Sequence, residues 1–355
     1  MTKKVQRCFA AGCRLFCAGV ALVALSADAV VAEGELTSRP SIQVSGFFDV
    51  LSSYQGAQMK NGEFGFGQAE IDLATALSPN ISMTLAVAYN NAAKDFGLGA
   101  AFMDWRVWKK PESAAAGGLA VDNVGVIVGR FDVPFGIDYR VYPSPVRQLV
   151  NCPTSIELTH CRWNDAGVQL YGNSPVGNVA LFAVNGFASS ATHWELQLNL
   201  ATGEEEMVEV SEDTTPKMAT GGRLGLTIVP GAEIGGSYAV GVNHDNHVET
   251  ELYGLDMQYT RGPARIKGEA LWHAVNQSIA PALNHGYYLE GAYSFGKPFI
   301  VLRRDGYSPE DQDSRGSWSP GIGYRLIDQA QFRAQYQMSD QRGVDAVWFQ
   351  TVVSF

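Results

Sequence analysis

Hydrophobic residues recur at every second position over most of this chain. In the final segment, Phe355, Val353, Thr351, Phe349 and Val347 alternate with a second, more mixed set of residues. Because successive side chains of a β-strand point to opposite faces of the sheet, this spacing predicts a strand with one almost wholly apolar face. A strand that stays apolar up to its last residue is expected to turn that face towards a bilayer.

The same alternation is found from residue 41 onwards, with charged residues on the opposite face of many segments. In one segment Phe332 and Tyr336 share one face, and Arg333 and Gln335 share the other. A soluble β-sandwich would also alternate, with its apolar face inwards. Charges on the polar face fit a water-filled lumen better, and aromatic residues near segment ends fit the girdles of a membrane barrel. The predicted strands include Ile42–Val50, Trp194–Leu200, Glu251–Tyr259, Arg265–His273, Tyr287–Phe295 and Gln331–Ser339.

Short and long connections alternate between these segments. Ser78–Asn80 is a short turn, for example, whereas Val275–His285 is longer and polar. Outer-membrane barrels have short periplasmic turns and longer external loops. We therefore predict an all-β fold, a transmembrane antiparallel up-and-down β-barrel of 16 strands over residues 41–355, with both termini periplasmic. An extra hairpin formed by Thr192–Leu200 and Met207–Ser211 would raise the number to 18.

The composition agrees with a membrane barrel. Charged residues make up 17% of the 355 residues, below the roughly 25% of an average soluble protein. The mean hydropathy is only -0.05, and no stretch after the N-terminal region approaches the roughly 20 apolar residues of a spanning helix. A polar lumen lowers the average hydropathy of a barrel in this way. The net charge of -10 and the lack of a basic cluster argue against nucleic-acid binding.

Residues 1–29 have the pattern of a secretory signal peptide. Basic residues precede the apolar stretch 15–25, and Ala27–Ala29 forms a small-x-small cleavage site. Cleavage after Ala32 is the alternative site. An apolar stretch of about eleven residues is too short for a membrane anchor, and a bulky Phe before Cys17 disfavours lipid attachment there.

Cys152 and Cys161 are the two cysteines that remain after cleavage. An even number of cysteines in an exported protein favours a disulfide, with two free thiols as the alternative. The bond would lie within a long connection, residues 139–164, and loops of this length are usually functional or disordered. We predict that this loop forms a constriction, and an external loop folded over the rim is the alternative. Its candidate residues are Arg140, Arg147, Glu157 and Arg162.

Residues 126–139 read Val-Ile-Val-Gly-Arg-Phe-Asp-Val-Pro-Phe-Gly-Ile-Asp-Tyr. A strand that ends in Gly-Arg-Phe, followed by Pro-Phe-Gly and a long loop, resembles the phosphate-selective porin-like outer-membrane proteins. The resemblance implies a loop that can fold into the pore, and porins of about this strand number are often homotrimers. The stacked basic residues of that family are not matched in the loop, so phosphate selectivity is not implied. The matching positions are Gly129, Arg130, Phe131, Pro134, Phe135 and Gly136.

Charged residues on the polar strand faces are the candidates for the pore lining. Rings of charge and the width of the constriction set the selectivity of a pore. For any one residue the alternative is a cross-strand ion pair that merely solvates the wall. The predicted lining residues are Asp104, Arg106, Glu195, Arg223, Asp256, Arg265, Lys267, Glu269, Glu290, Arg303, Arg325 and Arg333.

The predicted function is that of an outer-membrane porin, a water-filled channel for passive diffusion of small hydrophilic solutes or ions, surrounded by lipid and lipopolysaccharide. No cofactor and no metal site is expected, because His244 and His247 have no evident third ligand. The alternatives are a barrel enzyme of the lipase or protease type and a plugged structural barrel. The enzyme is disfavoured because Gly-x-Ser-x-Gly and His-Glu-x-x-His motifs do not occur.

Overall fold

The computed structural model describes most of the chain after the predicted signal peptide, which itself lies outside the described residues. Among the described residues no helix is both long and apolar enough to cross a membrane. The described residues are 41–55, 64–90, 95–111, 121–187, 194–198, 205–209, 218–242, 249–276, 281–310, 313–341 and 345–355.

Eighteen strands form in these residues, and 16 of them close into one barrel. Their lengths of 8 to 15 residues in the barrel fit strands that cross a bilayer at a tilt. The strands are β1 (Ile42–Gln55), β2 (Phe64–Ser78), β3 (Ile81–Asn90), β4 (Asp95–Lys109), β5 (Asn123–Asp132), β6 (Asn164–Ser174), β7 (Gly177–Val184), β8 (Trp194–Leu198), β9 (Glu205–Glu209), β10 (Ala219–Val229), β11 (Ala232–Val242), β12 (Glu249–Arg261), β13 (Ala264–Asn276), β14 (Pro281–Ser294), β15 (Pro298–Ser308), β16 (Arg315–Ile327), β17 (Ala330–Ser339) and β18 (Ala346–Ser354).

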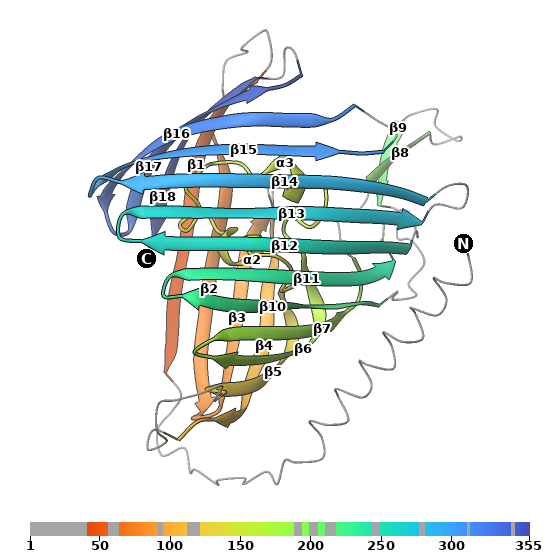
Figure 1. Ribbon diagram of the computed structural model, residues 1–355, viewed down its shortest axis with the longest axis vertical. Coiled ribbons are helices and arrows are strands. Elements are labelled where there is room, and N and C mark those ends of the chain that lie inside the picture. Colours follow the sequence, from red (N-terminus) through yellow and green to blue (C-terminus); the bar gives the residue numbers. More distant parts are fainter. Residues whose placement is uncertain are drawn as a thin grey trace. The chain divides into compact units, whose positions relative to one another are not determined.

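The barrel strands pair antiparallel with their sequence neighbours around the ring (Figure 1). β10 pairs with β7, and β18 pairs with β1 and closes the ring. A closed ring leaves no unpaired strand edge in the barrel. The predicted 16-stranded up-and-down barrel is therefore confirmed. The 18-stranded alternative is wrong, because β8 and β9 form a separate two-stranded sheet.

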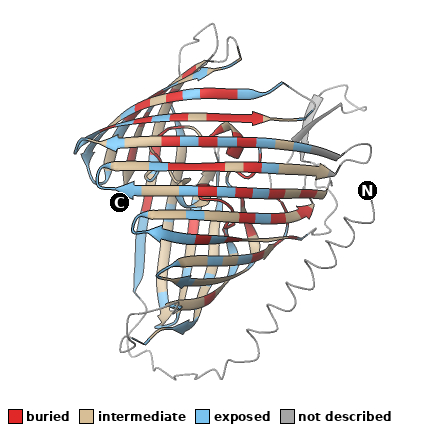
Figure 2. Cartoon of the chain, in the orientation of Figure 1, coloured by how far each residue is buried: buried red, intermediate tan, exposed pale blue. Residues whose placement is uncertain are grey.

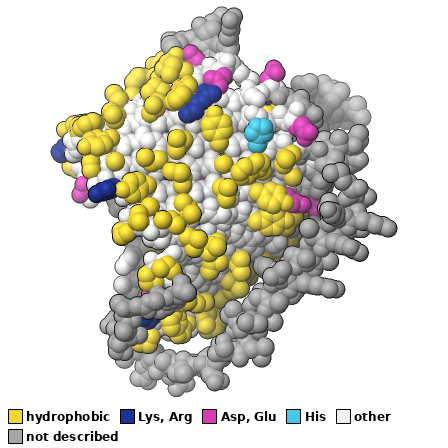
Figure 3. All heavy atoms as spheres, viewed as in Figure 1, with side chains coloured by type: hydrophobic (Ala, Val, Ile, Leu, Met, Phe, Trp, Pro, Cys, Tyr) yellow, Lys and Arg dark blue, Asp and Glu magenta, His cyan; other side chains and the backbone are white. Residues whose placement is uncertain are grey.

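The two faces of each strand have opposite character, as the alternation predicts. On β17, Phe332 and Tyr336 are exposed, whereas Arg333 and Gln335 are buried. Figure 2 shows buried and exposed segments following one another along single strands. Large hydrophobic side chains are exposed on nearly every barrel strand, and Figure 3 shows them spread over the visible outer face. This surface needs an apolar solvent, which a bilayer supplies.

The two ends of the barrel have different connections. At one end, which we call the turn end, Pro79–Asn80, Pro230–Gly231, Gly262–Pro263 and Asp328–Gln329 join consecutive strands. The opposite end carries the connection from β5 to β6, residues 133–163, which contains the short helices α2 (Asp138–Val141) and α3 (Thr154–Glu157). We call this connection the lumen loop.

The lumen loop lies inside the barrel. It makes hydrogen bonds with Gln68 on β2, Ser237 on β11, Glu269 on β13, Arg303 on β15 and Gln335 on β17. A segment that reaches strands on so many sides of a closed ring can only lie within it, and Figure 1 shows α2 and α3 behind the front strands.

Candidate functional site

The first turn of the lumen loop is fixed by a glycine and a buried carboxylate. Gly136 has a φ of 60°, a left-handed conformation that glycine adopts without strain. A side chain at this position would meet the carboxylate of Glu269. That carboxylate accepts the backbone N–H groups of Ile137 at 2.8 Å and Asp138 at 3.0 Å, and Gly136 N donates to Ser237 Oγ at 3.0 Å. The Pro-Phe-Gly motif therefore ends β5 and directs the chain into the lumen.

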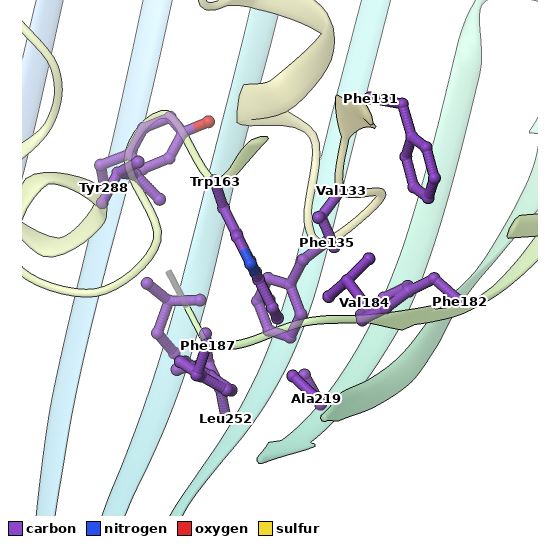
Figure 4. Packing of buried hydrophobic residues seen from close by; sticks show 13 residues of the cluster. Phe131, Val133, Phe135, Trp163, Phe182, Val184, Phe187, Ala219, Leu252 and Tyr288 are labelled. Carbon is purple, nitrogen blue, oxygen red and sulfur yellow. The ribbon is translucent and has the colours of Figure 1, made fainter. Parts of the chain in front are cut away.

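A hydrophobic cluster holds the two ends of the lumen loop against the wall (Figure 4). Phe135 and Ile156 are fully buried, and Trp163 is 3% exposed. Trp163 packs against Phe182 on β7 and Phe187 just after it, with ring centroids 5.4 and 4.6 Å apart. Val133 of the loop and Phe131 on β5 belong to the same cluster, and its other members come from β7, β10, β11, β12, β13 and β14. Apolar burial of this kind gives the loop a single docked position.

Charged side chains of β15 and β17 hold the middle of the lumen loop. Arg303 is 1% exposed and donates to the backbone oxygens of Asn151 and Cys152 at 2.9 and 3.2 Å. Arg333 donates to the carbonyl groups of Ser144 and Arg147. Arginine suits this task because its planar guanidinium offers five donors in a fixed arrangement. The barrel thus satisfies backbone carbonyl groups that the loop buries in the lumen.

Cys152 and Cys161 face each other within the lumen loop. The structure describes them as free thiols with their sulfur atoms 2.8 Å apart, so the disulfide stays a prediction. Asp138 adds a carboxylate within 4.8 Å of both sulfur atoms. Arg147 donates to Cys152 Sγ at 3.3 Å and already supplies positive charge at this point, so we propose no metal here. The hydrogen bond from Cys161, together with Arg147, lowers the pKa of Cys152.

His160 is buried beside the carboxylate that anchors the first turn. Its Nε2 atom lies 3.8 Å from Glu269 Oε2, and neither atom has a hydrogen-bond partner among the described residues. Its Nδ1 atom lies 2.9 Å from Thr159 Oγ1. Burial lowers the pKa of His160 to about 3, with a smaller contribution from His273. The imidazole is therefore neutral in the folded protein at neutral pH.

Acidification should destabilise the folded protein through His160. Its pKa falls from 6.5 to about 3 on folding, so the unfolded chain binds this proton first and stability is lost as the pH falls below about 6.5. We expect the midpoint of urea unfolding in detergent to fall more steeply between pH 7 and 5 in the wild-type protein than in a variant without this imidazole. His160→Gln should flatten this part of the profile, whereas an unchanged slope in that variant would contradict the assignment to His160.

A cavity of about 740 Å³ remains open between the lumen loop and the wall. Strands β4, β5, β6 and β7 line one side, and Tyr139 and Arg140 of α2 line the other. The wall contributes amide and phenol groups, which solvate polar solutes by hydrogen bonds; these are Asn123, Gln169, Tyr171, Asn173 and Asn178. The charged lining residues are Asp104, Arg106, Lys109, Lys110, Asp122 and Arg140.

A network of charges connects α2 with the wall beside this cavity. Arg223 on β10 donates to Asp256 at 2.5 and 3.0 Å and to Glu233 at 2.6 Å. Arg140 lies 3.7 Å from Glu233 and donates to Asn178 at 3.2 Å. The barrel wall therefore holds α2 at the edge of the cavity through Asn178 on β7 and Glu233 on β11, and Arg223 on β10 links Glu233 to Asp256 on β12.

The structure divides the predicted lining residues into several groups. Asp104 and Arg106 line the cavity, and Arg265 is half-buried near the turn end of β13. Arg325 is exposed near the turn end of β16, 5.7 Å from the ring of Phe299. Glu195 lies on β8, which is not part of the barrel, so its predicted place in the wall is wrong. Seven residues are buried, in ion pairs or beneath the lumen loop: Arg223, Asp256, Lys267, Glu269, Glu290, Arg303 and Arg333.

The predicted constriction residues also lie in different environments. Arg140 lines the cavity and Arg147 is buried beside Cys152. Glu157 and Arg162 are exposed, and Arg162 lies 5.3 Å from the ring of Tyr142. The sequence reasoning missed uncharged anchors of the loop, above all Gln335, which accepts the N–H of Val150 at 2.7 Å. The alternation of its strand already placed Gln335 on the inner face, but a search restricted to charged residues does not consider glutamine.

This chain is similar to known proteins in its structure but not in its sequence. No family model matches the sequence, and no curated protein matches it. The resemblance to the phosphate-selective porin-like proteins is therefore not confirmed at the level of the family. Solved structures do match.

A loop-deletion mutant of OmpT, an outer-membrane protein of Vibrio cholerae, has a TM-score of 0.62 at 10% identity, covering 90% of this chain and 100% of that chain. A trimer form of OmpT has a TM-score of 0.57 at 9% identity, covering 90% and 100%. The outer-membrane channel DcaP of Acinetobacter baumannii has 0.59 at 10% identity, covering 89% and 97%. An anion-selective porin of Comamonas acidovorans has 0.57 at 12% identity, covering 89% and 100%. At these identities the matches show the fold, which is that of the 16-stranded porins.

Proposed function

We propose that this protein is an outer-membrane porin, through which small hydrophilic solutes and ions diffuse passively. The observation that carries the proposal is the open cavity lined by polar and charged side chains inside a barrel whose outer face is apolar. A lumen loop that narrows the barrel without filling it fits a channel better than a plugged structural barrel. An enzyme would need a catalytic group in the lumen or at the rim, and no arrangement among the described residues favours one.

Conductance measurements test this function directly. Purified protein added to a planar bilayer in potassium chloride should give discrete, long-lived current steps. A heat-denatured sample of the same preparation is the control and should give none. Folded protein that inserts, as shown by resistance of the barrel to protease, but gives no steps would contradict the proposal.

The membrane arrangement follows from the same reasoning. We propose that the turn end and both termini face the periplasm, because short turns are on that side of outer-membrane barrels. Residues 1–29 would be the export signal, with residues 41–355 as the single barrel domain. Lipid and lipopolysaccharide would surround the apolar outer face, and a homotrimer is the assembly that the OmpT trimer form suggests.

We also propose that Cys152 and Cys161 form a disulfide in the exported protein. The closed loop is short, so a chain-entropy estimate gives about 2–3 kcal/mol of stabilisation. The unfolded, unreduced protein should then show no thiol that reacts with a maleimide, and a reducing agent should expose two. Labelling of both cysteines without reduction would contradict the bond.

A further inference from the structure

The side chains of His160 and Glu269 meet at the first turn of the lumen loop without a hydrogen bond between them. His160 Nε2 lies 3.8 Å from Glu269 Oε2, and neither atom has another hydrogen-bond partner among the described residues. His160 is 4% exposed and Glu269 is 3% exposed, so both atoms are shielded from bulk water. Buried polar atoms of folded proteins are nearly always paired, which indicates that something lies between these two.

The hydrogen bonds of Thr159 fix which nitrogen of the imidazole carries the hydrogen. Thr159 Oγ1 donates its one hydrogen to the carbonyl oxygen of Ser155 at 2.7 Å. The contact of 2.9 Å between Thr159 Oγ1 and His160 Nδ1 is therefore donated by the Nδ1–H group. Because burial lowers the pKa of His160 to about 3, the imidazole is neutral. Its Nε2 atom then carries no hydrogen and turns a lone pair towards Glu269.

Glu269 has no lysine or arginine within ion-pair distance in the part of the chain that the structure describes. Its ion-pair partner is His160, whose imidazole is neutral. Lys267, two residues earlier on the same face of β13, pairs with Glu290 instead at 3.5 Å. Asp256 lies directly opposite Glu269 on β12, and like charges in opposite positions destabilise a sheet. An ionised carboxylate would therefore be costly at this buried position.

The hydrogen-bond donors around Glu269 serve only one of its two oxygen atoms. Oε1 accepts the backbone N–H groups of Ile137 and Asp138 at 2.8 and 3.0 Å, and the hydroxyl of Tyr288 donates to the same atom at 3.3 Å. Oε2 is therefore the atom that is free to hold a proton. The titratable and charged groups that surround the pair are Asp138 on α2, Asp256 on β12 with its partner Arg223 on β10, Lys267 and His273 on β13, and Tyr288 and Glu290 on β14.

We propose that one proton is held between Glu269 Oε2 and His160 Nε2 when the lumen loop is docked, and that loss of this proton at alkaline pH releases the first turn of the loop. The proton turns two facing acceptors into a donor and an acceptor, and it removes the unbalanced charge. A side-chain shift of about 0.8 Å brings the two atoms to the roughly 3.0 Å of an ordinary hydrogen bond. The inference concerns loop docking and holds whether or not the barrel conducts.

Docking should therefore weaken as the pH rises. A solvated glutamate is ionised at neutral pH, so the docked loop binds one proton that the released loop does not. Above the pH at which the docked loop loses this proton, each further pH unit lowers the docking equilibrium constant about tenfold. This alkaline step is distinct from the titration of His160, which destabilises the protein below about pH 6.5.

Limited proteolysis of the folded barrel in detergent tests the proposal. A protease that is active from pH 7 to 10 should cleave within residues 133–163 faster as the pH rises, by up to about tenfold per unit. The rate on the denatured protein at each pH corrects for the protease itself. Mass analysis of the fragments shows where the chain is cut.

Two variants remove the need for the proton. In Glu269→Gln the side-chain amide donates to His160 Nε2 at every pH, so loop cleavage should stay slow from pH 7 to 10. In His160→Gln the amide donates to the ionised Glu269, which should also flatten the dependence. Asp340→Asn is the matched control, because Asp340 pairs with Arg304 at the surface, and it should keep the wild-type dependence.

The other outcomes would overturn the proposal. A wild-type loop that is cleaved at one corrected rate from pH 7 to 10 would favour a water molecule between the two atoms. Equal pH dependence in the wild type, Glu269→Gln and His160→Gln would assign the titration to another group, such as the phenol of Tyr288. Cleavage spread over the barrel strands would show that alkaline pH unfolds the whole protein. If Glu269→Gln does not fold, His160→Gln decides by itself.

Discussion

Replacing Arg303 by Ala should release the middle of the lumen loop and increase the single-channel conductance. The guanidinium donates to Asn151 and Cys152 of the loop and to Asp305 on its own strand at 3.0 Å. Its removal leaves buried carbonyl groups without a donor and Asp305 without its cation. The loss of one partner from a buried charged network costs about 3–5 kcal/mol. The midpoint of urea unfolding in detergent measures this loss, and bilayer recordings measure the conductance.

Two further variants test whether the expected effect is specific to the guanidinium of Arg303. Arg303→Lys retains the charge but not the planar set of donors, so its effect should be smaller than that of Ala. Arg304→Ala changes the next residue, which pairs with Asp340 at the surface, and exposed ion pairs contribute about 0–1 kcal/mol. If the changes at 303 and 304 lowered the unfolding midpoint equally, Arg303 would have no special part in holding the loop.

Phe135→Ala should cause the largest loss of loop docking among the hydrophobic changes. Phe135 is fully buried, and its ring lies 4.8 Å from that of His160 and 6.4 Å from that of Trp163. Truncation of a buried Phe to Ala costs about 3–5 kcal/mol, since the removed ring leaves a cavity that neighbours fill only in part. We expect the lumen loop of this variant to become sensitive to protease while the barrel stays resistant.

Phe295→Ala provides the comparison for that experiment. Phe295 is 60% exposed near the turn end, so its truncation leaves no internal cavity and should cost less. Mass analysis of the fragments shows whether cleavage falls within residues 133–163. An intact lumen loop in Phe135→Ala under conditions that cleave unfolded protein would refute the role of this cluster in docking.

Much of the barrel could be predicted because the alternation within each segment identifies it as a strand without information from the rest of the chain. Phe332 and Arg333 take opposite faces of β17 as the alternation requires, and the short turns fall at one end of the ring. The predicted hairpin around Glu195 shows the limit of this reasoning. Its residues alternate like those of a barrel strand, yet among the described strands β8 pairs only with β9. Alternation predicts that a segment is a strand, but it does not predict which strand it pairs with.

The candidate site was predicted less well than the fold. Arg106, Asp104 and Arg140 do line the open cavity, and Cys152 and Cys161 do meet. Arg303, Arg333 and other inward charges hold the loop instead of facing open lumen. The strand pattern shows that a side chain points inwards, but what it meets there depends on where a distant loop lies.

The amino-acid sequence by itself determined the barrel and the character of its two faces, because a period of two and the spacing of turns are local properties. The choice between 16 and 18 strands was made by the tertiary structure, in which β8 and β9 form a separate sheet. Only the tertiary structure decided which part of the lumen stays open. The anchors of the lumen loop are distant in sequence: Glu269 lies 132 residues from Ile137, and Gln335 lies 185 residues from Val150. Such pairs come into contact only when the ring has closed, so no local sequence pattern can predict them.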